Sequence, residues 1–183
     1  HEGNGTIPCR AGGTEMTESS ETMEIKMSNG ATLIDSEDFN RVNGFNWFVN
    51  RQGKRRDIYY VVAPIKINKK WTRIRIHRLI LNANIGEIID HINGDGLDNR
   101  KCNLRFCTHQ QNIMNRRITN GTSKYKGVGW HKGANKWQVQ ICFNYKLKYL
   151  GLYTNEIDAA HRYNEEAIKI FGEFAKLNEI SND

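Results

Sequence analysis

Acidic residues are missing from a long central part of the chain, since residues 99–155 contain no aspartate or glutamate. The same stretch contains eleven lysines and arginines, and residues 51–78 contain ten more against a single acid, Asp57. Such one-sided charge is typical of a surface that binds a phosphate backbone, because each neutralised phosphate releases a condensed counterion. A generic basic surface is the alternative interpretation of the same charges.

The chain also lacks a hydrophobic run near the ~18 residues of a membrane span and a secretory signal, so no membrane partner is expected. Its four cysteines form neither CxxC pairs nor a small secreted framework, and a reducing cytosol fits them best. Cys102 and Cys107 near His109 could suggest zinc, but a second ligand pair is lacking. Buried thiols are therefore the favoured interpretation of these two cysteines.

The length of 183 residues allows one ordinary domain or two small ones, and we favour two. Residues 1–22 are polar and without periodicity, so they predict a disordered tail. A first module is expected over residues 23–117 and a second over residues 123–178. The polar residues 118–122 between them predict a linker.

The first module is expected to begin as a β-rich segment. Two short apolar-alternating runs flank Asn29-Gly30, a pair that favours a tight hairpin turn. A short helix around Phe39 and Val42 should follow, then strands over residues 45–49, 58–63 and 71–76. In the last of these strands, Arg73 and Arg75 alternate with apolar residues, so both arginines are expected on an exposed face that can meet DNA.

The densest chemistry lies between Ile89 and Asn112, where Asp90-His91 precede a glycine-containing loop. Phosphodiester hydrolysis needs a base for the attacking water and a cation for the developing charge. His91 suits the base because its pKa is nearest neutrality. Asp90 and Asn112 offer the hard oxygen ligands that Mg²⁺ (or Mn²⁺) accepts. Asn103 can hydrogen-bond within the hairpin loop and hold His91 in register.

These residues resemble the HNH (ββα-metal) endonucleases, particularly those of phages and group I introns. The matching pattern reads HRLI, IDHINGDGLDNRKCNL and RFCTHQQN over residues 77–112. The resemblance implies a β-hairpin followed by a helix, with His91 as general base, Asp90 and Asn112 on the metal, and Asn103 orienting His91. Asn112 stands where many relatives have histidine. His77 is expected to be structural or to contact phosphate rather than metal.

The second module is expected to contain three strands and a final helix that starts at Thr154-Asn155-Glu156, ends at Gly172 and covers their apolar face. The segments YKGV, KWQVQI, YLG, EIDAAHRYNEEA and FGEFAKLN resemble the AP2 DNA-binding domain. This resemblance implies a three-stranded antiparallel sheet that reads bases in the major groove. Its implied DNA contacts are Lys126, His131, Trp137, Gln138 and Gln140, with Lys146 and Lys148 on phosphates. Trp130 and Trp137 are equally acceptable as core aromatics.

The sequence therefore predicts an α+β protein with a ββα-metal nuclease core and an AP2-type sheet packed on one helix. The expected activity is metal-dependent hydrolysis of duplex DNA, similar to that of a homing endonuclease. We expect a monomer in the cytoplasm of a bacterial or phage-infected cell. The alternatives are a DNA-binding regulator with an inactive HNH core and, less favoured, an RNA-acting or structural protein.

Overall fold

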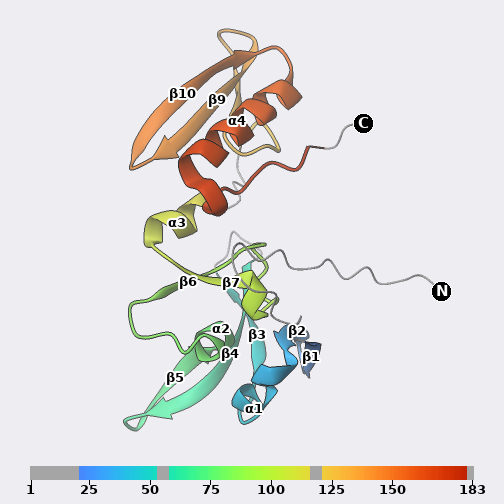
Figure 1. Ribbon diagram of the computed structural model, residues 1–183, viewed down its shortest axis with the longest axis vertical. Coiled ribbons are helices and arrows are strands. Elements are labelled where there is room, and N and C mark those ends of the chain that lie inside the picture. Colours follow the sequence, from blue (N-terminus) through green and yellow to red (C-terminus); the bar gives the residue numbers. More distant parts are fainter. Residues whose placement is uncertain (1–20, 53–57, 116–120, 181–183) are drawn as a thin grey trace, which may run out of the picture. The chain divides into compact units, whose positions relative to one another are not determined.

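The computed structural model describes residues 21–52, 58–115 and 121–180 (Figure 1). The chain divides into two compact units, residues 1–107 and 108–183, whose positions relative to one another are not determined. The expected tail lies outside the described residues except at its end, where β1 begins at Thr22. Most of the expected linker at residues 118–122 also lies outside them, so that boundary stays a prediction.

The first unit begins with the expected antiparallel hairpin, β1 (Thr22–Met27) and β2 (Gly30–Asp35). Met27 pairs with Gly30, so the turn lies at Ser28 and Asn29, one residue earlier than expected. The Asn29 side chain instead donates to the Val49 carbonyl at 2.8 Å and accepts from the Val49 amide at 2.9 Å. A contact to a distant strand has thus overridden the local turn preference.

A short 3-10 turn η1 (Ser36–Asp38) and helix α1 (Phe39–Val42) lead into a three-stranded sheet. Its antiparallel strands, in the order β3-β4-β5, are β3 (Phe48–Gln52), β4 (Ile58–Ile67) and β5 (Lys70–Arg75). The expected strand at residues 45–49 starts later because Trp47 turns inward and donates to the Val42 carbonyl at 2.8 Å. Strand β4 continues through Pro64 beyond the end of β3, where only β5 pairs with it, and such an edge position tolerates proline.

Helix α2 (Ile76–Ile80) follows directly, and the expected hairpin then forms from β6 (Ile88–His91) and β7 (Leu104–Cys107). The 3-10 turn η2 (Lys101–Asn103) precedes β7. The core of this unit combines residues from β2, α1, β4, α2 and β7 with Trp47, namely Ile34, Val42, Trp47, Val61, Ala63, Ile76, Ile80 and Leu104.

Strand β2 also contacts the loop between β6 and β7. Leu33 forms an isolated parallel bridge with Asp98, its amide donating to the Leu97 carbonyl at 3.0 Å and its carbonyl accepting from the Asn99 amide at 2.8 Å. On the other side of this loop, Gly96 packs so tightly on β4 that an added Cβ would lie 2.1 Å from the Tyr59 carbonyl oxygen. The loop is therefore held between β2 and β4.

The second unit begins with α3 (His109–Met114), which Thr108 caps as expected through a reciprocal capping box with Gln111. Strands β8 (Val128–His131), β9 (Lys136–Phe143) and β10 (Lys146–Tyr153) form an antiparallel sheet in the order β10-β9-β8. Helix α4 (Glu156–Phe171) lies along this sheet, followed by the 3-10 turn η3 (Gly172–Phe174) (Figure 1). Buried Val139 and Ile141 face α4, as their alternation predicted.

The described residues thus form a mixed α and β protein with several small antiparallel sheets, in agreement with the expected α+β class. Among them, no helix combines the length and apolarity that crossing a bilayer requires.

The packing of Gly96 on β4 gives a test of how the β6–β7 loop is held. We expect Gly96→Ala to destabilise the first unit by about 1–3 kcal/mol, because the methyl group has no space beside the Tyr59 carbonyl. Gly44→Ala is the matched control, since an added Cβ at Gly44 meets nothing within 4 Å. Urea unfolding of both variants measures the difference, and equal midpoints would show that the loop is not confined there.

Candidate functional site

Asp90 and His91 end strand β6, and both side chains are buried, with 6% and 5% exposure. The antiparallel register places Asp90 opposite Arg105 on β7. Arg105 donates to Asp90 Oδ2 from Nε at 3.1 Å and from Nη2 at 2.9 Å. The guanidinium thereby offsets the charge of a carboxylate that burial would otherwise penalise.

The imidazole of His91 is enclosed by polar and aromatic side chains. Its Nε2 lies 3.1 Å from Asn99 Oδ1, and its ring centroid lies 5.0 Å from that of His77 and 5.9 Å from that of Tyr60. Burial lowers the pKa of His91, although the Asn99 hydrogen bond and the Asp90 charge act in the opposite direction. His91 is therefore neutral at neutral pH, which is the form that can accept a proton.

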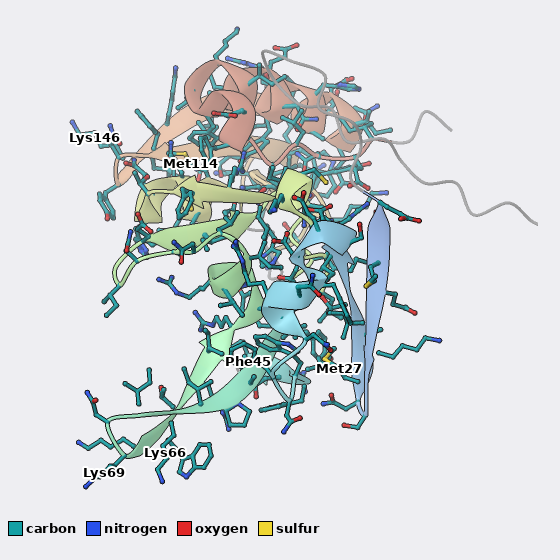
Figure 2. All side chains as sticks on the ribbon, turned by 60° about the horizontal axis from the view of Figure 1, so that its bottom comes forward. Met27, Phe45, Lys66, Lys69, Met114 and Lys146 are labelled. Carbon is teal, nitrogen blue, oxygen red and sulfur yellow. The ribbon has the colours of Figure 1, made fainter. Side chains whose placement is uncertain are left out.

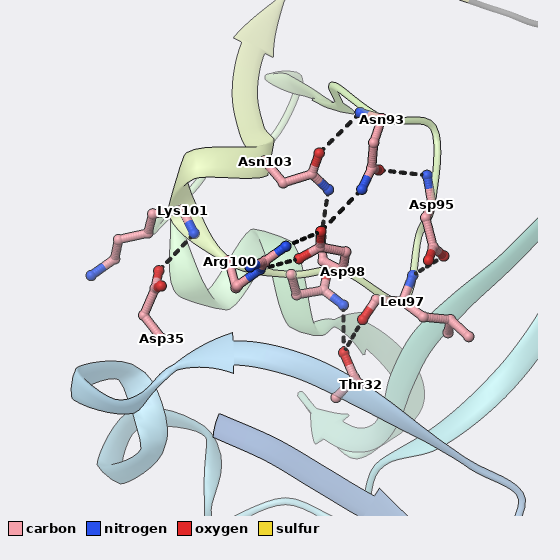
Figure 3. Close-up of polar contacts among 10 residues, drawn as sticks. Thr32, Asp35, Asn93, Asp95, Leu97, Asp98, Arg100, Lys101 and Asn103 are labelled. Atoms are coloured by element: carbon pink, nitrogen blue, oxygen red, sulfur yellow. Dashed lines mark hydrogen bonds and ion pairs between the residues drawn. The ribbon is translucent and has the colours of Figure 1, made fainter. Parts of the chain in front are cut away.

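Asn103 lies at the end of η2 and hydrogen-bonds within the hairpin loop. Its Oδ1 accepts from the Asn93 amide at 2.9 Å, and its Nδ2 donates to the Asp98 carbonyl at 2.7 Å (Figure 3). The spacing of the sequence suggested such loop contacts. The hydrogen bond to His91 Nε2 comes from Asn99, so Asn103 can act on His91 only through the conformation of the loop.

Sequence reasoning missed Asn99, which has 0% exposure. It also missed the neighbouring pair in which Arg100 donates from Nε and Nη2 to the two oxygens of Asp98, each at 2.8 Å (Figure 3). The sequence does contain one relevant signal, the high density of Asn and Asp between residues 93 and 99. Such side chains commonly form hydrogen bonds with nearby backbone, so this density indicates a loop ordered by its own side chains. The sequence could not show which of them faces the histidine.

Asn112, the second expected metal ligand, is half-buried on α3 and belongs to the second unit, so its role with Asp90 stays a prediction. A carboxylate and an amide oxygen are hard donors that suit Mg²⁺ or Mn²⁺. Within the described part of the chain, no three His, Cys, Asp or Glu side chains group as a metal site. Cys102 is exposed and Cys107 only half-buried, so the expectation of two buried thiols is wrong.

One face of the β3–β4–β5 sheet combines cationic and aromatic side chains. Exposed Arg73 lies over the Phe48 ring at 5.7 Å and exposed Arg75 over the Tyr60 ring at 5.3 Å. Nearer the hairpin tip, Lys66 lies 5.9 Å from the ring of Trp71, which is 73% exposed (Figure 2). Because the Tyr60 ring also packs beside His91, this basic-aromatic face lies next to the buried histidine.

The lysines of the second unit lie differently from their expected positions. Lys148 pairs in register with Ile141 on the α4 side of the sheet, and its Nζ lies 2.7 Å from Glu166 Oε1 on α4. Lys146 pairs with Phe143 and shares this side, so the expectation that these two lysines lie on the open face is wrong. Lys126 is half-buried, donates to the Met114 carbonyl, and has its pKa lowered to about 8 by burial.

The open face of the sheet instead carries Gln138 and Gln140, with Tyr149 opposite Gln140 in register and 55% exposed. His131 is exposed, and its Nδ1 accepts from the Ala134 amide at 3.0 Å. Trp137 is half-buried against the core and packs edge-on against Trp130 at 4.9 Å between ring centroids. Of the two interpretations of Trp137, this placement favours the core aromatic.

The buried His77 gives a prediction on acid stability. Burial, followed by the charge of His91, lowers the pKa of His77 to about 3. Between pH 6.5 and about 3, His77 is therefore protonated in the unfolded chain but neutral in the folded one. Its contribution to the free energy of unfolding is complete above pH 6.5 and is lost as the pH falls toward about 3. We expect His77→Gln to reduce the slope of unfolding free energy against pH by up to about 1.4 kcal/mol per unit. Exposed His161→Gln is the control, and equal slopes in chemical denaturation would contradict this placement of His77.

Comparison with known proteins connects this geometry to a family. Residues 75–114 match the family model described as HNH endonuclease. An uncharacterized HNH endonuclease of Acanthamoeba polyphaga mimivirus is 28% identical over 141 residues, which cover 76% of this chain and 70% of the relative.

Two plant proteins are similar over a smaller part of the chain. An ethylene-responsive transcription factor of Arabidopsis thaliana is 39% identical and an AP2-like ethylene-responsive transcription factor of the same plant 36% identical, each across 36% of this chain. The matched segments make up only 16% and 18% of those two proteins. No solved structure is significantly similar to the chain. Together, the family match at residues 75–114 and the similarity to the viral relative assign this chain an HNH endonuclease domain and the activity class of an endonuclease.

Proposed function

We propose that this chain is a metal-dependent endonuclease that hydrolyses phosphodiester bonds in duplex DNA. The observation that carries the proposal is His91, a buried and neutral imidazole beside a carboxylate within the HNH-matched segment. A neutral histidine held in one orientation can accept the proton of the attacking water. The buried Asp90–Arg105 pair fixes the end of β6 from which His91 projects.

HNH nucleases typically use a divalent metal, and Mg²⁺ or Mn²⁺ held by Asp90 and Asn112 would stabilise the charge that develops on the phosphate. Asp90 supplies the anionic oxygen donor of this pair, and Arg105 keeps its carboxylate fixed. Asn103 contributes by closing the loop between β6 and β7.

The basic-aromatic face of β3–β4–β5 supports duplex DNA as the substrate. Arg73 and Arg75 are exposed and lie on the face whose Tyr60 packs beside His91. Guanidinium groups suit phosphate contacts because they present several donors in a fixed plane. We propose that these arginines position the DNA backbone, which fixes register without reading sequence.

We further propose that the second unit aids site recognition as an AP2-like module, in the manner of a homing endonuclease acting as a monomer. The similarity to two plant transcription factors supports this part. Gln138, Gln140 and His131 on or beside the open face are the candidates for base contacts, and exposed Tyr149 joins them. The same similarity favours the second candidate function, a non-catalytic DNA-binding regulator.

Cleavage of plasmid DNA separates these two functions. We expect the protein to nick or linearise supercoiled plasmid that carries its site when Mg²⁺ is present, and we expect EDTA to abolish this cleavage. The His91→Ala variant should cleave about 10²–10⁴-fold more slowly. Exposed His161→Ala on α4 serves as the matched control and should cleave normally. Tight binding without cleavage by the wild-type protein would favour the regulator.

The salt dependence of DNA binding tests the proposed arginine contacts. Arg73→Ala should weaken binding to all sequences and reduce the slope of log K against log salt by about 1, because one phosphate contact is lost. Lys26→Ala is the control, because Lys26 lies on β1 with its side chain 84% exposed and its substitution removes the same single positive charge. Equal slopes for the two variants, measured by fluorescence anisotropy, would remove Arg73 from the DNA-contacting surface.

A further inference from the structure

Asn99 connects His91 to strand β2 through a buried hydrogen-bonded chain. Its Oδ1 lies 3.1 Å from His91 Nε2, and its Nδ2 donates to Thr32 Oγ1 at 2.8 Å and to the Gly96 carbonyl at 3.2 Å. Thr32 Oγ1 in turn donates to the Leu97 carbonyl at 2.7 Å (Figure 3). Asn99 and Thr32 have 0% and 1% exposure, so water does not compete for these bonds.

The acceptors at the end of this chain determine the position of each proton. The Leu97 carbonyl can only accept, so the Thr32 hydroxyl hydrogen points to it and the Thr32 oxygen is left as an acceptor. The Asn99 atom facing Thr32 and the Gly96 carbonyl must therefore be the amide nitrogen, which orients the Asn99 oxygen toward His91. An amide oxygen can only accept, so His91 Nε2 carries the hydrogen.

We propose that Thr32 and Asn99 are positioning residues that hold His91 in its Nε2-protonated tautomer and leave Nδ1 as the nitrogen with the lone pair. The inference rests on the proposed function only in giving His91 the role of general base. A neutral imidazole has one donor and one acceptor nitrogen, and only the acceptor can take a proton from water. Thr32 thus acts on the reaction through Asn99 without touching substrate.

The strand that supplies Thr32 lies outside the segment matched by the HNH family model, residues 75–114. Its hydroxyl is the only one in the chain of bonds, and the backbone bridge between Leu33 and Asp98 holds it beside the loop. Replacing the hydroxyl by a methyl group would leave only the longer, 3.2 Å hydrogen bond to the Gly96 carbonyl to orient the Asn99 amide. The oxygen and the nitrogen of Asn99 could then exchange places for the loss of that one bond, and the second arrangement stabilises the opposite tautomer of His91.

The test uses the full chain with ¹⁵N-labelled histidine and compares wild type with Thr32→Val, Thr32→Ser and Thr22→Val. Thr22 is exposed on β1 of the same hairpin and provides the matched control for the substitution. Long-range ¹H–¹⁵N correlation spectra at pH 7.5 distinguish the protonated and unprotonated ring nitrogens of each histidine. The His91 signals are assigned from their loss in His91→Gln.

We expect wild type, Thr32→Ser and Thr22→Val to show a protonated Nε2 and an unprotonated Nδ1 at His91. Thr32→Val should move the ¹⁵N chemical shifts of both His91 ring nitrogens toward the average of the two tautomers. It should also lower kcat at least about tenfold with KM little changed, as expected when the general base spends time in the wrong tautomer. Restoration by Thr32→Ser separates positioning from a loss of folding. A wild-type His91 protonated at Nδ1 overturns the proposal even if Thr32→Val does not fold.

The spectra and the cleavage assay fail independently of each other. If the wild type cleaves DNA while Thr32→Val retains both the tautomer and kcat, the positioning role is wrong and the endonuclease proposal stands. If the tautomer shifts as expected but no variant, including wild type, cleaves DNA, the proposed function is wrong and the hydrogen-bonded control of His91 stands.

Discussion

The contact between β2 and loop residues 96–99 is the constraint on which the first unit depends. This loop has no ladder of its own, and its buried polar groups need partners from elsewhere in the chain. Strand β2 provides them through the Leu33 amide and carbonyl and the Thr32 hydroxyl. The β6–β7 hairpin has only four residues in each strand, and an isolated two-stranded hairpin is marginal in water. The proposed catalytic residues of this hairpin are therefore held in place by the strand that packs beside them.

Features encoded by local signals could be predicted from the sequence. The capping box at Thr108 and the alternation of Val139 and Ile141 depend on neighbouring residues, and each appears in the structure as expected. The hairpin carrying Asp90 and His91 belongs to the same class. Local physics here agrees with the tertiary structure, which is the usual condition for a reliable prediction.

Features decided by distant partners could not be predicted in this way. Lys148 was expected to face DNA, but its pairing with Glu166 on α4 depends on strand register and on the placement of a helix. The Asn29 side chain bonds Val49 and not its own turn. Asn99 is one of several Asn and Asp residues in its loop, and only β2 distinguishes it. In each case the deciding atom lies far away in the sequence.

The position of Thr32 outside residues 75–114 has a consequence for modularity. An HNH segment whose proposed general base depends on a hydroxyl from another strand is not self-contained, even when its own motif is complete. Grafting residues 75–114 onto a new scaffold would transfer Asp90, His91 and Asn103 without the partner of the Asn99 amide. The smallest portable form of the proposed nuclease site is therefore a discontinuous one, consisting of the motif together with the strand that packs on its loop.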